Sequence, residues 1–165
     1  RGHAGALRVE SNVGLGTTFT LALPPCREQS PASRLDGPAH EQWRRDGQVL
    51  VIDDEAPVRD VAAELLRTYG FTVVTAADGA EGIRHVAENP GRFDVVFLDL
   101  TMPGMDGIET LGRLRAINPK IRVLLVSGYS ESERIATLAH DGSILFMQKP
   151  FTRARLEERL RSILA

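Results

Sequence analysis

Short runs of apolar residues alternate with longer amphipathic segments along most of the chain. The run at 49–52 is rich in β-branched residues and ends at two aspartates, which is typical of a buried parallel strand. Apolar residues then recur at helical spacing between Pro57, which suits the first turn of a helix, and Gly70, which is placed to end it. This strand and helix unit recurs to the end of the chain.

The recurring unit predicts five strands and five helices. We expect strands at 49–52, 71–75, 93–98, 122–126 and 144–147, and further helices at 79–88, 108–117, 130–140 and 153–164. Short connections between such units require right-handed crossovers, and therefore a parallel sheet with helices on both faces. The pattern predicts a doubly wound α/β domain, in which ligands lie beyond the carboxyl ends of the strands.

Two further β segments precede this domain. Residues Leu7–Glu10 and Thr17–Leu23 flank a glycine turn at Gly14 and Gly16, which predicts a two-stranded hairpin. Two strands alone are marginal in water. The polar segment that follows is broken by Pro and Gly and has no helical or strand period, which is typical of a linker. The predicted divisions are a β segment at 1–24, a linker at 25–47 and the α/β domain at 48–165.

Composition and charge exclude several classes of function. The 165 residues, 42% hydrophobic and 25% charged, fit one globular domain with a short appendage. A formal charge of -2, from 20 basic and 22 acidic residues mixed along the chain, provides no basic field for nucleic acid, which is not an expected partner. The single Cys26 permits no intramolecular disulfide and fits a reducing cytoplasm. No apolar run approaches the ~20 residues of a membrane helix, so we expect no membrane contact by this chain.

Polar side chains gather at the expected strand ends. Asp53 and Asp54 follow the first strand, Asp99 the third, Ser127 the fourth and Lys149 the fifth. These positions converge because the carboxyl ends of parallel strands meet at one edge of the sheet. Three carboxylates brought together repel one another, and a divalent cation or an ammonium group relieves that repulsion. The oxygen ligands favour Mg²⁺.

Asp99 is the expected nucleophile, because it emerges from the middle of the sheet on a rigid strand end. A carboxylate that attacks phosphorus forms an acyl phosphate, and the charge on the equatorial oxygens then needs cations and hydrogen-bond donors in place. Mg²⁺, the ammonium group of Lys149 and the hydroxyl group of Ser127 would supply them.

Four stretches closely resemble the receiver domain of response regulators in two-component signalling. They are VLVIDDE at 49–55, LDLTMPGMDG at 98–107, VSGY at 126–129 and KPF at 149–151. The resemblance covers about residues 48–165. It implies a flavodoxin-like, CheY-like five-stranded sheet in the order 2-1-3-4-5 and a Mg²⁺-dependent phosphorelay function.

The resemblance also implies a role for each matching position at the acceptor. Asp53 and Asp54 resemble the acidic pair that holds Mg²⁺, and Asp99 resembles the phosphorylated aspartate, itself a metal ligand. The main-chain carbonyl of Thr101 resembles a further metal ligand. Ser127 resembles the residue that hydrogen-bonds the phosphoryl group, and Lys149 the residue that pairs with it.

The same family resemblance implies a switch. Phe146 matches the aromatic switch position, Tyr129 could shape partner access, and the Lys149–Pro150 peptide is expected to be cis. Phosphorylation is expected to draw Ser127 inward and to let Phe146 turn. The surface made by the helix at 130–140, the strand at 144–147 and the helix at 153–164 would then change. The expected partner is the dimerisation and phosphotransfer domain of a histidine kinase or a separate histidine phosphotransfer protein.

The N-terminal segment resembles a different domain. Residues 7–24 resemble the last glycine box and terminal strand of a histidine-kinase ATP-binding domain. Because only that tail is present, this chain is not expected to bind ATP usefully or to phosphorylate a histidine. The resemblance implies a hybrid sensor histidine kinase as the parent, whose membrane anchor, if it has one, would lie outside this chain. The chemistry expected of this chain is phosphorylation and autodephosphorylation of the aspartate.

Two other functions use the same residues. A small aspartyl-phosphate phosphatase would also need a strand-end aspartate and Mg²⁺, but it requires a second acid two residues later, where Thr101 stands. An interaction module with an inactive acceptor site is disfavoured because every position with a chemical role is occupied.

Overall fold

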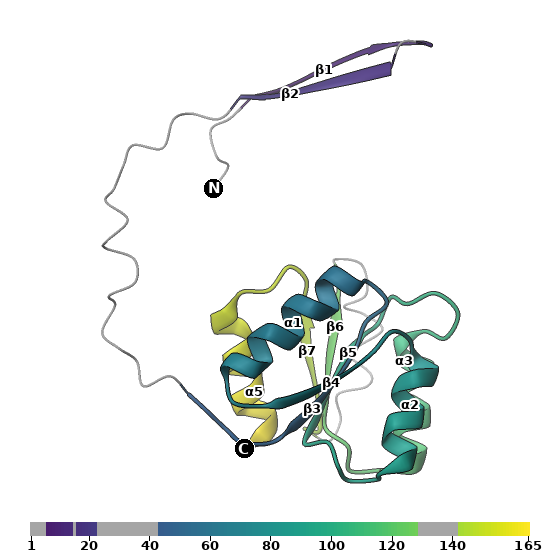
Figure 1. Cartoon of the computed structure of the whole chain (residues 1–165), viewed down its shortest axis with the longest axis vertical. Helices are drawn as coiled ribbons and strands as arrows, with labels where there is room; N and C mark the ends of the chain where they lie inside the picture. Colours follow the sequence, from purple (N-terminus) through teal and green to yellow (C-terminus); the bar gives the residue numbers. More distant parts are fainter. Residues whose placement is uncertain (1–5, 15, 23–42, 129–141) are drawn as a thin grey trace. The chain divides into compact units, whose positions relative to one another are not determined.

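The computed structural model describes residues 6–14, 16–22, 43–128 and 142–165, in two compact units, Arg1–His40 and Glu41–Ala165 (Figure 1). The expected helix at 130–140, Tyr129 and most of the expected linker lie outside the described residues. The domain boundary expected at residue 48 stays a prediction; Trp43 and Arg45, which precede it, both contact Tyr69.

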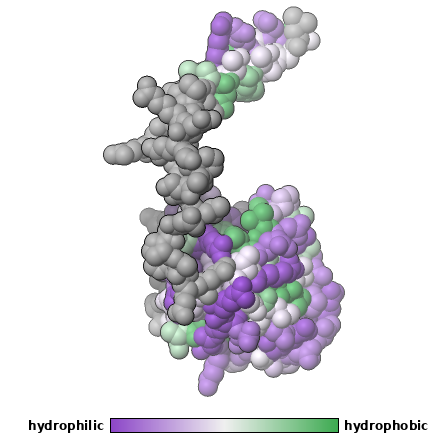
Figure 2. All heavy atoms as spheres, turned by 60° about the vertical axis from the view of Figure 1, so that its left-hand side comes forward, coloured by the Kyte–Doolittle hydropathy of each residue, from purple (hydrophilic) through white to green (hydrophobic). Residues whose placement is uncertain are grey.

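The described part of the first unit is an antiparallel hairpin. Strand β1 spans Ala6–Asn12 and strand β2 spans Gly16–Ala22, so the expected hairpin is confirmed. The register pairs Leu7 with Leu21 and Val9 with Phe19. All four side chains are more than half exposed, and apolar surface is visible on this hairpin in Figure 2.

The second unit contains the predicted five-stranded parallel sheet. Its order is β4-β3-β5-β6-β7, which is 2-1-3-4-5 when the strands are counted within this unit, as the family resemblance implied. The strands are β3 (Gln48–Ile52), β4 (Thr72–Ala76), β5 (Val95–Asp99), β6 (Val123–Ser127) and β7 (Ile144–Gln148).

Helices cover both faces of this sheet (Figure 1). Alternate strand residues point to opposite faces, so Val49 and Val51 pack against α1 (Ala56–Thr68) and α5 (Arg153–Leu164). Leu50 and Ile52 pack on the other side against α2 (Gly79–Glu88) and α3 (Gly107–Ile117). Among the described helices, none has both the length and the apolar character needed to cross a membrane.

The predicted strand boundaries were wrong by one or two residues at several ends. Asp99 and Ser127 were placed just past their strands, but each is the last residue of one, because the ladder continues through the pairs Asp99 with Val126 and Ser127 with Gln148. The third strand begins at Val95 rather than Phe93. Asp94, which was expected to belong to this strand, lies just before it, and its carboxylate accepts a hydrogen bond from the main-chain N–H of Gln48 at 2.8 Å.

Candidate functional site

Three aspartates meet at the carboxyl edge of the sheet. Asp53 and Asp54 follow β3, and Asp99 ends the neighbouring strand β5. One carboxylate oxygen from each lies within 4.8 Å of the others. Asp53 is 0% exposed and Asp99 is 3% exposed, whereas Asp54 is more accessible. The convergence expected from the parallel topology is therefore present.

Lys149 lies between two of these carboxylates. Its Nζ is 2.8 Å from Asp53 Oδ2 and 3.2 Å from Asp99 Oδ2. Burial disfavours the charged ammonium, but hydrogen bonds and attraction from both aspartates outweigh burial and raise the pKa of Lys149. The main-chain N–H of Lys149 donates to the carbonyl of Ser127 at 2.7 Å, and the peptide to Pro150 is cis, as expected. Lys149 is thus a fixed positive charge inside the cluster.

Asp99 has an environment that resists ionisation. Its burial raises the pKa, and the nearby charge of Asp53 raises it further. Lys149 and the main-chain amide of Thr101 favour the carboxylate, but the pKa remains above its usual range. A further positive charge at the site would lower this pKa and would stabilise the ionised carboxylate of Asp99.

Asp53 is held on several sides. Its Oδ1 accepts a hydrogen bond from the main-chain N–H of Glu55 at 2.9 Å, and its main-chain carbonyl accepts one from Arg59 Nη1 at 2.6 Å. Sequence reasoning missed Arg59. The signal that could have indicated it is a basic residue in the first turn of a helix that begins beside an acidic pair.

The donor set fits Mg²⁺. Hard carboxylate oxygens converge from three residues, and the carboxylate of Asp54 makes no hydrogen bond or ion pair with the residues that the structure describes. A magnesium site needs only one or two protein carboxylates and leaves the remaining positions to water and phosphate. Asp54 is therefore available as a ligand, next to two buried carboxylates.

The other predicted residues are placed as follows. Ser127 is buried at the end of β6, on the strand next to Asp99. Thr101 is exposed two residues after Asp99. Phe146 is on β7, paired in register with Leu125, and is half-buried against the core that faces α2 and α3. Tyr129 lies outside the described residues, so its role stays a prediction.

Comparisons with known proteins agree with this geometry. The response regulator receiver domain model matches residues 49–161. Sensor kinase CckA of Brucella abortus is 33% identical over 97% of this chain, which spans 18% of that kinase. Sporulation initiation phosphotransferase F of Bacillus subtilis is 31% identical, covering 71% of this chain and 93% of that protein.

The solved structures lead to the same family. The receiver domain from the hybrid histidine kinase CckA is 33% identical, with a TM-score of 0.61, and the match covers 72% of this chain and all of that one. Receiver domains bind Mg²⁺ at an acidic pocket, and those of phosphorelays interact with histidine kinases or phosphotransfer proteins. The fold, the acidic cluster and the family match agree, and the chain belongs to the response regulator receiver domain family.

Proposed function

We propose that Asp99 is the phosphoacceptor of this receiver domain and takes its phosphoryl group from a phosphohistidine. The observation that carries the proposal is the position of Lys149 Nζ, within 3.2 Å of Asp99 and 2.8 Å of Asp53. This arrangement supplies a buried carboxylate at a rigid strand end with a cation already beside it, where negative charge accumulates during phosphoryl transfer.

In the proposed reaction, a carboxylate oxygen of Asp99 attacks the phosphorus atom of the phosphohistidine. The new bond is O–P, the P–N bond breaks, and its electron pair returns to the imidazole. Lys149 neutralises charge on the phosphoryl oxygens, and the Ser127 hydroxyl donates a hydrogen bond to one of them. Mg²⁺, when held by Asp53, Asp54, Asp99 and the main-chain carbonyl of Thr101, would add positive charge at the same oxygens.

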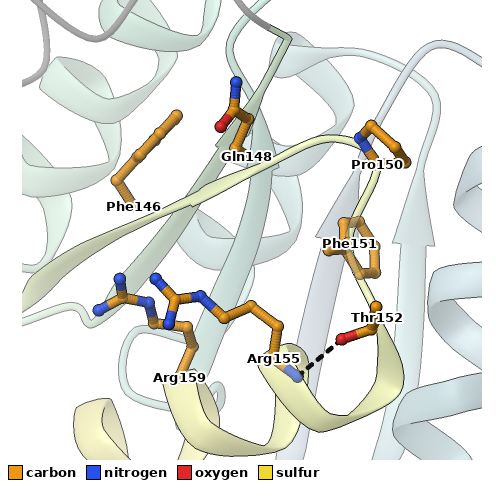
Figure 3. A pocket seen from close by; sticks show the side chains of 7 residues that line it. All are labelled: Phe146, Gln148, Pro150, Phe151, Thr152, Arg155 and Arg159. Atoms are coloured by element: carbon orange, nitrogen blue, oxygen red, sulfur yellow. Dashed lines mark hydrogen bonds between the residues drawn. The ribbon is translucent and has the colours of Figure 1, made fainter. Parts of the chain in front are cut away.

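We propose that Phe146 is the switch side chain. It lines a pocket of about 420 Å³ next to the loop after β7, together with Gln148, Pro150, Phe151, Thr152, Arg155 and Arg159 (Figure 3). Because Phe146 is only half-buried at the edge of this space, its ring has room to change rotamer when Ser127 moves. The surface of β7 and α5 would then differ between the two states.

The proposed phosphodonor docks on an apolar groove beside the acceptor. A groove of about 500 Å³ runs along α1 to Lys149 and is lined by Pro57, Val58, Val61, Leu65, Lys149, Pro150 and Phe151. The side chain of Val61 is 59% exposed, and apolar residues interrupt the polar surface of this unit in Figure 2. An amphipathic helix that carries a histidine would bury its apolar face here.

We also propose that the parent of this chain is a hybrid sensor histidine kinase. The match to sensor kinase CckA extends over 97% of the chain and so includes the hairpin. The hairpin has one apolar face that is exposed in this unit, as expected of a piece of a larger sheet. In this proposal, residues 1–24 are the end of the kinase ATP-binding domain, residues 25–47 are a linker and residues 48–165 are the receiver domain.

The proposal is tested by intact-mass spectrometry of the full chain after incubation with acetyl phosphate, with Mg²⁺ or with EDTA. The wild type and a control, Asp60→Asn on the exposed face of α1, should each gain one phosphoryl group only with Mg²⁺. Asp99→Asn should gain none, and Lys149→Met should gain far less. A folded wild type that gains nothing would favour an interaction module, and rapid turnover of acetyl phosphate without a stable adduct would favour a phosphatase.

A further inference from the structure

The segment just before the sheet is bound to the receiver unit through an aromatic cluster. The ring of Trp43 lies 5.8 Å from that of Tyr69 and 6.0 Å from that of Phe71, centroid to centroid. The guanidinium group of Arg161, on α5, lies over the Trp43 ring at 5.4 Å. Such contacts add to the apolar area that the rings bury. Trp43 therefore packs directly on the end of α1 and on α5.

Arg45 fixes the same segment by hydrogen bonds. Its main-chain N–H donates to the carbonyl of Tyr69 at 2.9 Å, and its Nη1 donates to the carbonyl of Leu164 at 2.8 Å, near the end of α5. Gly70 has a φ of +99° and sits under this segment, where an added Cβ would lie 3.2 Å from the Arg45 carbonyl oxygen. The segment thus holds the end of α1 and the end of α5 together.

Tyr69 connects this segment to the loop that carries Lys149. It is fully buried, and its hydroxyl donates a hydrogen bond to the carbonyl of Arg153 at 3.0 Å. The Arg153 guanidinium lies over the same ring at 5.3 Å. Burial raises the pKa of Tyr69, although Arg153 opposes this, so the hydroxyl keeps the proton that it donates. Arg153 begins α5, only four residues after Lys149.

The loop between Lys149 and Arg153 is tied to the core at its middle as well. The Phe151 ring packs edge-on against Phe97 of β5 at 5.8 Å, and Phe97 lies two residues before Asp99. A displacement of Tyr69 is therefore passed to a short loop with packed contacts on both sides. Short, densely packed connections transmit displacement because protein interiors have few voids to absorb it.

We propose that Tyr69 is a positioning residue that couples the segment Trp43–Arg45 to the loop bearing Lys149, so that a displacement of Trp43 changes the reactivity of the acceptor. The coupling is reciprocal by thermodynamic necessity, and occupancy of the acceptor must also affect the packing of Trp43. The geometry of the coupling stands without the proposed function, whereas its effect on reactivity rests on the roles proposed for Asp99 and Lys149.

The first test uses the full chain without any ligand. In ¹⁵N NMR spectra, Trp43→Ala should shift the amide resonances of Lys149, Phe151, Thr152 and Arg153, and Trp43→Phe should restore most of them. In a Tyr69→Phe background, which removes only the hydroxyl link to Arg153, Trp43→Ala should shift them much less. Unchanged loop resonances in Trp43→Ala, or an equal shift in the Tyr69→Phe background, would overturn the coupling.

The second test reads the reciprocal effect at Trp43, which is the only tryptophan of the chain. Beryllofluoride with Mg²⁺ should change its fluorescence emission in the wild type and change it less in Tyr69→Phe, while ¹⁹F NMR monitors binding. Tyr69→Phe should also slow phosphorylation by acetyl phosphate about fivefold, at the lower end of typical coupling between sites. If beryllofluoride binds but the fluorescence emission of Trp43 does not change, the coupling is contradicted and the acceptor function is not. If the loop resonances shift in the first test but beryllofluoride does not bind in the second, the acceptor function is contradicted instead.

Discussion

Replacing Asp99 with Asn should stabilise the protein when no divalent cation is present. The substitution keeps the size of the side chain and removes one of three negative charges that meet within 4.8 Å. Asp99 is 3% exposed, and its pKa is raised chiefly by burial, so its ionised form is costly in the folded state. Under the proposed function, a bound cation would offset this cost.

The size of the effect follows from the charges around Asp99. With 4.8 Å as the separation, each of two carboxylates repels it by about 3.5 kcal/mol at an effective dielectric constant of about 20. Lys149, at 3.2 Å, attracts it by about 5 kcal/mol on the same scale. Solvent screens the more accessible Asp54, so repulsion and attraction nearly cancel, and the burial of Asp99, which is the largest cause of its raised pKa, leaves its ionised form costly in the folded state. We therefore expect Asp99→Asn to gain about 1 to 2 kcal/mol in unfolding free energy.

The pH dependence has a definite sign. Because the pKa of Asp99 is raised in the folded protein, the folded state binds this proton more tightly than the unfolded chain does. The unfolding free energy of the wild type therefore falls as the pH rises from the ordinary aspartate pKa through the raised one. Asp99→Asn lacks this part of the pH dependence, so the gap between the two proteins should widen over that interval and then level off.

Urea unfolding and thermal melts in EDTA and in Mg²⁺ measure the effect. In EDTA at neutral pH the Asn variant should melt higher, by about 4 °C for each kcal/mol in a domain of this size. Mg²⁺ should raise the wild-type melting temperature more than that of the variant, since a ligand that binds only the folded state stabilises it by mass action. Asp60→Asn serves as the exposed control. A variant less stable than the wild type in EDTA would refute the electrostatic reasoning.

Two further predictions concern the frame and the partner surface. Gly107→Ala should lower the unfolding free energy by about 2 to 4 kcal/mol in urea, because the new Cβ would meet the Asp99 carbonyl oxygen and would lie 2.6 Å from Leu100 Cα. Gly112→Ala on the same helix has nothing within 4 Å and should be neutral or stabilising by up to about 1 kcal/mol. Val61→Asp in the α1 groove should slow phosphoryl transfer from a phosphorylated kinase dimerisation domain at least tenfold and should leave labelling by acetyl phosphate unchanged. Equal effects on both reactions would exclude the groove as a docking site.

The sequence was most informative where structure is local. The β-branched run at 49–52 and the punctuation by Pro57 and Gly70 predicted β3 and α1 because strand formation and helix termination depend on neighbouring residues. The clustering of Asp53, Asp99 and Lys149 was also predictable, since a parallel sheet brings strand ends together whatever the details of packing. The order of the strands came from the family resemblance, because periodicity alone does not specify which strand lies in the centre.

What the sequence did not indicate depends on contacts between distant residues. Trp43 stands in a polar segment with no periodicity, and its place in the fold depends on packing against Tyr69, Phe71 and Arg161. Likewise the sequence predicts Asp94 to be a strand residue, but its carboxylate accepts a hydrogen bond from the main-chain N–H of Gln48, 46 positions away. The chemistry of such a site can therefore be predicted from residues at strand ends, whereas the contacts that hold its frame come from side chains whose partners only the folded structure reveals.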